Sequence, residues 1–337
     1  MKAERCPRLG TRPLTALLAV LLAGLCLFSL SVGASSLSPA QSLAALLGRG
    51  EDIARRIVLY VRLPRLLGAL LAGSALALAG VLLQRVLLNP LAAPSVIGVN
   101  AGAGLFALCA MAFFPAHPGL TPLAAFAGAL VSALTVYALA QLTGASRSSI
   151  VLAGVAVSSL LGAVMDAIVT LIPDAAGARS AFSIGGFESV TLDQLRFALP
   201  LCSAGAVLAW LLRRESGILA LGDETARGLG VRVGAVRLAL VAAAALLAGG
   251  AVSFAGLLGF VGLITPHAAR AMVRGEDGIM PLSMVLGALL TTLCDLIART
   301  LFAPYELPVG VVLAFLGAPF FLYLLFRGKR SNRHDGT

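Results

Sequence analysis

Charged side chains are scarce in this sequence. Asp, Glu, Lys and Arg make up 12% of its 337 residues, whereas hydrophobic residues make up 59%. A soluble globular domain usually carries about 25% charged residues. The shortage of charge and the long apolar runs exclude an ordinary soluble domain, and they predict an all-α polytopic membrane protein.

Residues that bind metals or form disulfides are also few. Five cysteines are scattered, mostly within apolar runs, and three histidines lie far apart. Neither the spacing of a metal site nor that of a disulfide framework occurs. We therefore predict no metal site in this chain.

The motifs of ATP-hydrolysing and membrane-embedded enzymes are missing. The sequence contains no G-x-x-x-x-G-K-[ST], so it cannot cradle ATP phosphates in a P-loop. It also contains no H-E-x-x-H motif and no Asp/His cluster, which disfavours an intramembrane enzyme. We predict a chain that is not an enzyme and that binds no cofactor itself.

Acidic residues inside the apolar runs are rare, with Asp166 and Asp295 as the two candidates. An ion-coupled secondary transporter acting alone needs acids near the middle of the membrane, so it is a poor alternative. For Asp166 we favour a hydrogen bond to Ser or Thr inside the helix bundle over a transport role. Asp295 precedes Arg299 by four residues, which suits an intrahelical ion pair.

Apolar runs dominate the chain, and most are near the ~20 residues that a bilayer core requires. We count ten runs, which predict about ten transmembrane helices in one domain over 14–326, between tails at 1–13 and 327–337. A cleaved signal peptide is the alternative for the first run, but its apolar stretch exceeds the usual 7–15 residues. The runs cover residues 14–34, 66–84, 96–114, 123–142, 150–172, 195–212, 235–254, 257–273, 281–302 and 309–326.

The net charge of +10 could suggest a nucleic-acid partner. The basic residues lie between the apolar runs, however, so they report membrane orientation instead. Placing both termini in the cytoplasm puts seventeen of the 25 Lys and Arg residues on the cytoplasmic side. We therefore predict cytoplasmic termini, a bilayer as partner and no nucleic acid.

Arg62 and Arg65 lie just before the second run, on the side predicted to be outside. Basic residues normally gather on the cytoplasmic side, so this pair needs another explanation. One hypothesis is that they receive an acidic partner protein. The alternative is that their side chains snorkel to lipid headgroups.

The longest predicted cytoplasmic loop covers residues 213–233, and its segment 221–230 is typical of a short helix. Asp223 suits the N-cap, and Glu224 suits the positive end of the helix dipole. Arg227 suits the last turn, and Gly228 or Gly230 can end the helix. Such a helix could fill a groove on a partner, or it could be a solvated linker.

Nine groups of residues, in order from about residue 55 to 327, together resemble the permeases of type II ABC importers. That family moves iron-siderophores, haem and cobalamin. Each motif alone is weak, but the ordered set is specific. The motifs are Arg62–Arg65, Gln84 with Asn89–Ala92, Gly98 with Gly102, Leu152–Val155, Gly185–Phe187, Gly259–His267 with Arg270, Asp295 with Arg299, Glu306–Gly310 and Gly317–Phe320.

The resemblance implies a multi-pass permease of the inner membrane that works as a homodimer above two ATPase subunits. ATP and Mg would bind to those partner subunits. An extracytoplasmic substrate-binding protein would deliver the cargo, most commonly a ferric siderophore, with haem and cobalamin as alternatives.

The resemblance also implies roles for particular residues. Arg62, Arg65 and Arg299 would pair with acidic residues of the binding protein. A cytoplasmic gate would lie at Ser146, Arg147, Ser148 and Ser149. The segment that couples to the ATPase would comprise Leu221, Gly222, Asp223, Glu224, Thr225, Ala226, Arg227 and Gly230.

Overall fold

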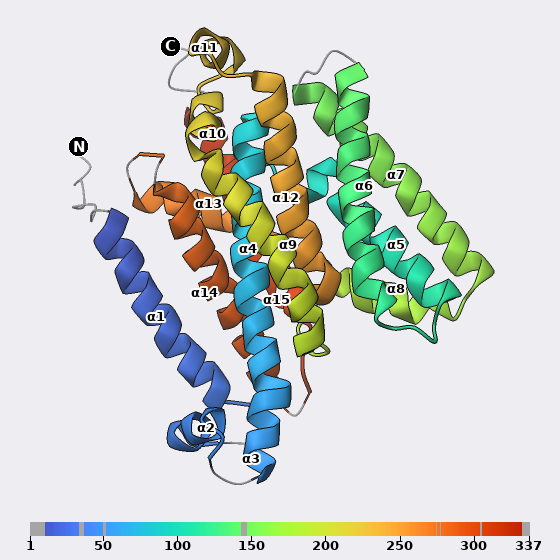
Figure 1. Ribbon diagram of the computed structural model, residues 1–337, viewed down its shortest axis with the longest axis vertical. Coiled ribbons are helices and arrows are strands. Elements are labelled where there is room, and N and C mark those ends of the chain that lie inside the picture. The colour runs from blue at the N-terminus through green and yellow to red at the C-terminus, as the bar shows by residue number, and fades with distance from the viewer. Residues whose placement is uncertain are drawn as a thin grey trace.

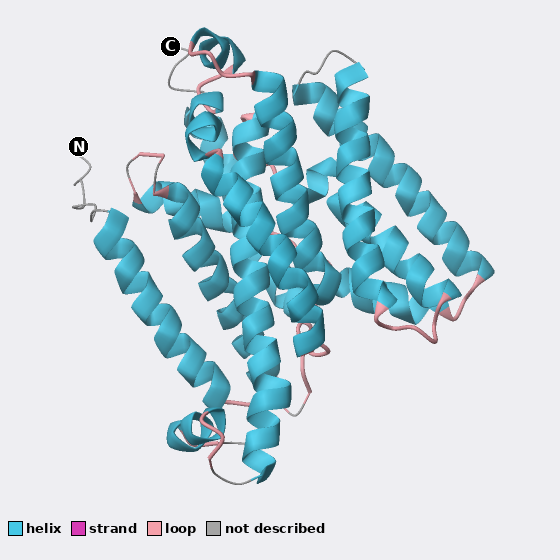
Figure 2. Ribbon diagram, in the orientation of Figure 1, coloured by secondary structure: helices cyan, strands magenta, loops and turns pink. Residues whose placement is uncertain are grey.

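The structure is a computed structural model that describes residues 11–33, 37–49, 52–142, 147–273, 275–276, 278–303 and 305–331. Every regular element in these ranges is helical (Figure 2). The predicted all-α class is therefore confirmed.

A helix coincides with each of the ten apolar runs. Among the described residues, seven helical segments are long and apolar enough to cross a membrane, whereas α5, α13 and the apolar part of α15 are shorter, so ten is an approximate count. The ten helices are α1 (Thr11–Ser31), α4 (Leu63–Leu87), α5 (Val99–Phe113), α6 (Leu120–Leu142), α7 (Arg147–Leu171), α9 (Leu192–Leu211), α12 (Val233–Ala255), α13 (Val261–Met272), α14 (Ile279–Thr300) and α15 (Val309–Ser331).

Shorter helices occupy the two ends of the bundle (Figure 1). At the end where α1 finishes lie α2 (Pro39–Leu46), α3 (Asp52–Ile57) and the π-helical turn η1 (Val58–Arg62), which continues into α4. The opposite end carries α10 (Arg213–Leu219) and α11 (Asp223–Gly228). The remaining short elements are η2 (Pro94–Ile97) and α8 (Ala175–Ile184).

The core of the bundle is built on α4 and α12. In each, 78% of the most apolar stretch of 18 residues is buried, whereas the corresponding share in α7 is 11%. Figure 1 shows α4 and α12 in the middle of the molecule, with α1 on one flank and α7 on the other. Helices that are apolar all round are the ones that a bundle buries, and α4 and α12 fit that description.

Glycines let α4 touch its neighbours backbone to backbone. A Cβ added at Gly73 would lie 2.3 Å from the carbonyl oxygen of Gly287 in α14. One added at Gly80 would lie 2.0 Å from the carbonyl oxygen of Gly262 in α13. Small residues thus set the close contact of these helices, as is common in membranes.

Candidate functional site

The three arginines with a proposed docking role are buried. Arg62, Arg65 and Arg299 are only 5%, 6% and 5% exposed. They lie at the α2–α3 end of the bundle, where they form the arginine cluster: Arg62, Arg65 and Arg299 with Asp295 and Glu306. The alternative that Arg62 and Arg65 snorkel to lipid headgroups does not fit the structure, because each binds partners within the chain.

Arg65 is the centre of the arginine cluster. Its Nε donates to Oδ1 of Asp295 at 2.7 Å, and its Nη1 donates to Oε2 of Glu306 at 2.6 Å. Asp295 is 1% exposed, so a buried carboxylate faces a buried guanidinium. The predicted intrahelical pair is also present, with Arg299 Nε 3.7 Å from Asp295 Oδ2. These contacts join α4 to α14 and to the segment before α15.

The other two arginines bind the end of α1. Arg62 Nη1 donates to the carbonyl oxygens of Leu30 and Ser31 at 2.7 and 2.9 Å. Arg299 Nη2 donates to the carbonyl oxygen and to Oγ of Ser29, both at 2.6 Å. Cations at a helix C-terminus satisfy its last carbonyls and complement the helix dipole. Arg62 and Arg299 therefore fasten a peripheral helix to the core.

At the opposite end, Asp223 does not cap α11. Gly222, with a φ of 112°, occupies the N-cap position, and Asp223 is the first helical residue. Its carboxylate instead accepts two hydrogen bonds from Nη2 of Arg237 in α12, at 2.8 and 2.7 Å. Arg237 is 3% exposed. A charge-assisted contact thus joins α11 to the beginning of α12.

The outward surface of α11 is suited to contact a partner. Ala226 is fully buried beneath the helix, while Glu224, Thr225 and Arg227 are exposed. Leu221 and Leu229, on either side of α11, are 66% and 62% exposed. The helix ends at Gly228 with Arg227 in its last turn, as predicted, and Gly230 follows with a φ of 81°. The surface of α11 thus combines polar side chains with two exposed leucines.

A second contact, missed by the sequence reasoning, joins α10 to α4. Arg85, near the end of α4, donates from Nη1 to Oγ of Ser216 in α10 at 2.9 Å. Its Nε and Nη2 donate to Oε2 of Glu276 at 3.1 and 2.7 Å. Arg85 is 4% exposed, so its bond to Ser216 is buried, whereas Glu276 is half exposed. The α10–α11 segment is therefore tied to both central helices.

The predicted gate falls partly outside the described residues. Ser146 lies outside them, and the structure describes the backbone but not the side chain of Arg147, where α7 begins. Ser148 is exposed and Ser149 is half-buried. The proposed gate therefore stays a prediction.

Asp166 does not bind Ser or Thr through its carboxylate, so that interpretation is wrong. Its Oδ1 accepts a hydrogen bond from Nη1 of Arg179 in α8, and its side chain is 68% exposed. Thr170 Oγ1 does donate to Asp166, but to its backbone carbonyl. The contact joins α7 to α8 and leaves Asp166 away from the buried interior.

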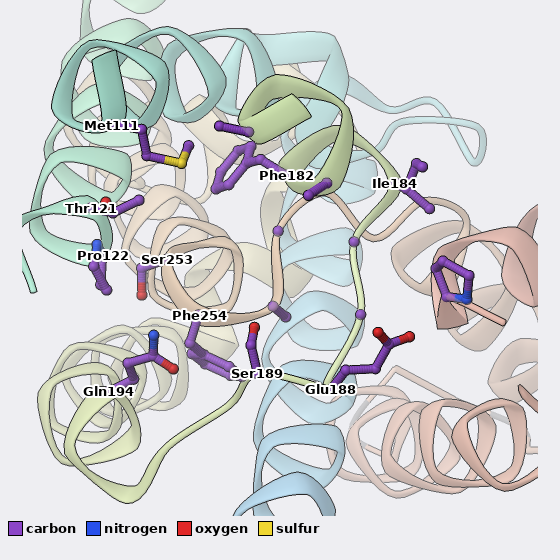
Figure 3. Close-up of a pocket in the computed structure, with 17 residues that line it drawn as sticks. Met111, Thr121, Pro122, Phe182, Ile184, Glu188, Ser189, Gln194, Ser253 and Phe254 are labelled. Carbon is purple, nitrogen blue, oxygen red and sulfur yellow. The ribbon is translucent and has the colours of Figure 1, made fainter. Parts of the chain in front are cut away.

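A cavity of about 320 Å³ opens between α5, α6, α8, α9 and α12. Figure 3 shows Glu188, Ser189 and Gln194 on one side of it and Met111 and Phe182 on the other. The loop 185–189 forms one wall, and backbone hydrogen bonds hold it: Gly186 donates to Ala255, and Gly310 donates to Gly185. Within the described ranges, no group of three His, Cys, Asp or Glu side chains could hold a metal ion.

A helical bundle of this kind, with an anchored short helix at one end, is the fold of a type II ABC importer permease. The FecCD transport family matches residues 20–327. The chain therefore belongs to the FecCD transport family, and it is a multi-pass membrane permease.

Individual relatives agree with this assignment. The chain is 40% identical over 309 residues to the achromobactin transport system permease protein CbrC of Dickeya dadantii. The aligned region covers 89% of this chain and 87% of CbrC. It is 38% identical over 277 residues to the cobalamin import system permease protein BtuC of Halobacterium salinarum, covering 81% of this chain and 74% of BtuC.

A solved structure has the same fold. It is described as an inward-facing conformation of a metal-chelate type ABC transporter, and it superposes with a TM-score of 0.82 at 26% identity. The match covers 94% of this chain and 99% of that chain.

Proposed function

We propose that this chain is the membrane-spanning subunit of an ATP-driven importer of a metal chelate, with a ferric siderophore as cargo. The α10–α11 segment carries the proposal. It presents an exposed surface at one end of the bundle, and contacts with the buried arginines Arg85 and Arg237 anchor it to α4 and α12. A partner ATPase that moved α11 would therefore act directly on the two central helices.

The energy for transport would come from the partner ATPase subunits, which bind ATP and Mg. Nucleotide can shift a permease between outward and inward states only if its binding favours one of them. In this proposal, Asp223 and Arg237 pass the movement of α11 to α12, while Ser216 and Arg85 pass it to α4.

A second copy of the chain would complete the transport route. Most of α7 is uncovered, with Leu152, Val155 and Leu160 at 69%, 59% and 65% exposure. These side chains could face lipid or another copy, and a homodimer would place the route between the two copies. The cargo would then pass through a largely apolar cavity along the two-fold axis.

Cargo would be handed over at the end that holds the arginine cluster, by an extracytoplasmic binding protein. That arrangement puts α11 and both termini on the cytoplasmic side of the inner membrane. Direct pairing of Arg62, Arg65 and Arg299 with this protein stays a prediction. For such pairing, the three arginines would have to leave their present partners in α1, in α14 and in the segment before α15. They would then bind carboxylates of the binding protein instead.

The cargo can be tested by uptake in cells that lack all other chelate importers and express this permease with its partners. We expect these cells to accumulate radiolabelled ferric siderophore. Depleting ATP should abolish the accumulation, and unlabelled siderophore should reduce it by competition. Haem and cobalamin are the alternatives, and similarity to a cobalamin permease favours the second. Uptake of labelled cobalamin or haem without uptake of any ferric siderophore would contradict the proposed cargo.

A further inference from the structure

A second groove lies on the surface of the bundle, between α9 and α14, with α4 as its floor. These three helices stand side by side in Figure 1. The groove has a volume of about 350 Å³, and its lining is almost entirely apolar. Its side chains come from α4, α9 and the first turns of α14, and include Leu78, Ala206, Val207, Trp210, Met280 and Met284.

Two arginines begin α10, close in sequence to the Trp210 end of this groove. Arg213 and Arg214 are the first two residues of α10, one residue after α9 ends, and both are exposed. The Arg213 guanidinium lies over the Trp210 ring, 5.3 Å from its centroid. No ion pair joins either arginine to a carboxylate in the part of the chain that the structure describes. Glu276, an acid near this end, is already bound by Arg85, and Glu215 next to Arg214 is half-buried.

A comparison within the same molecule shows that this charge is unusual. Another apolar groove runs between α4 and α9 toward the opposite end, lined by Leu67, Leu71 and Leu195 among others. Its basic residue, Arg196, is paired with Asp193 at 3.1 Å. The basic residue of that groove is therefore neutralised, whereas Arg213 and Arg214 beside the Trp210 groove form no ion pair in the described part of the chain.

We propose that the Trp210 groove binds an anionic phospholipid. An acyl chain lies along Leu78, Met280 and Met284, and the phosphate lies on Arg213 and Arg214. Tryptophan at a membrane interface prefers the depth of the headgroups, and basic pockets between spanning helices bind acidic headgroups. Arginine binds phosphate through charge-assisted hydrogen bonds. The bound headgroup would lie beside α10, next to the contact between Ser216 and Arg85.

The test uses Trp210 itself, which is the single tryptophan of the chain. The full transporter is placed in nanodiscs that contain brominated phosphatidylglycerol or brominated phosphatidylcholine at equal fraction. Fluorescence of a Trp210→Phe transporter is subtracted to remove the signal of partner subunits. From the quenching of Trp210 by each brominated lipid, we expect the groove to prefer phosphatidylglycerol over phosphatidylcholine at least about fivefold. One arginine near a charged surface supplies a factor of this size. The readout is independent of transport, so it does not depend on the proposed cargo.

Three variants make the test specific. Arg213→Gln with Arg214→Gln should bring the preference close to one, while Arg213→Lys with Arg214→Lys should retain it. Arg196→Gln, at the neutral groove, should leave it unchanged. Equal quenching by the two lipids in the unmodified transporter would overturn the proposal. So would a preference that survives in the double glutamine variant, or one that Arg196→Gln also removes.

Discussion

Replacing Arg65 with leucine is expected to destabilise the folded permease by about 3–5 kcal/mol, because Asp295 would lose its closest cation while it stays buried. Arg65 and Asp295 are 6% and 1% exposed, so water cannot replace the lost contact. The measurement is the thermal midpoint of the detergent-solubilised chain, defined as the temperature at which half of the monodisperse peak in size-exclusion chromatography is lost. The matched control is Arg196→Leu, whose ion pair is mostly exposed and should contribute only ~0–1 kcal/mol.

A second substitution tests the physical reason. If the cost comes from the carboxylate left without Arg65, Arg65→Leu combined with Asp295→Leu should recover part of the lost stability, although Arg299 then loses its contact with Asp295. Similar midpoints for Arg65→Leu and Arg196→Leu would contradict a buried structural pair. That result would favour an arginine that is exposed in the working protein.

Uptake is expected to fall between about fivefold and 150-fold in an Asp223→Ala variant, the range of a coupling free energy of 1–3 kcal/mol. The substitution removes both hydrogen bonds from Arg237 and leaves that arginine buried without this carboxylate. The measurement is ATP-dependent uptake at matched amounts of permease. Asp193→Ala, which breaks an exposed pair at the opposite end, should transport normally. Normal uptake by Asp223→Ala would refute coupling through this contact.

Disulfide or bifunctional crosslinking shows whether α11 touches the ATPase at all. A cysteine at Thr225 is exposed and should crosslink to the partner, whereas a cysteine at Ala226, one residue on and fully buried, should not. Equal crosslinking at the two positions would point to a disordered segment, and none at Thr225 would place the partner elsewhere.

The long helices could be predicted from the sequence, because each coincides with an apolar run and such runs are local features, but the number that span a membrane is only approximate. The run 257–273 forms α13, which is twelve residues long and the shortest of the ten helices. The helices α2, α3, α8 and α10 were not predicted. They lie outside the runs, where hydrophobic length gives no signal.

The ion-pair partner of a charged residue could be predicted from the sequence only where both residues lie in one helix. The Asp295 and Arg299 pair follows from a spacing of four residues. The contacts of Arg65 with Asp295 and of Arg85 with Glu276 join residues 230 and 191 positions apart, so no local pattern reveals them. An arginine at the end of an apolar run looks the same whether it faces lipid, a partner or a buried carboxylate.

Asp223 shows the same limit on a smaller scale. Its position before a short helix is typical of an N-cap, but Gly222 can adopt the positive φ that begins α11 and thereby shifts Asp223 into the first turn. There the buried Arg237, fourteen residues later, is a stronger partner than the backbone N–H groups. Tertiary electrostatics thus overrides a local capping preference.

The most direct test of the central claim is to purify the tagged chain from its own host in mild detergent and to reconstitute what accompanies it. We predict two copies of this chain with two ATPase subunits, and uptake of chelate into liposomes that requires ATP and the binding protein. A chain that reproducibly purifies alone and transports into liposomes without ATP would contradict the account and identify a secondary transporter.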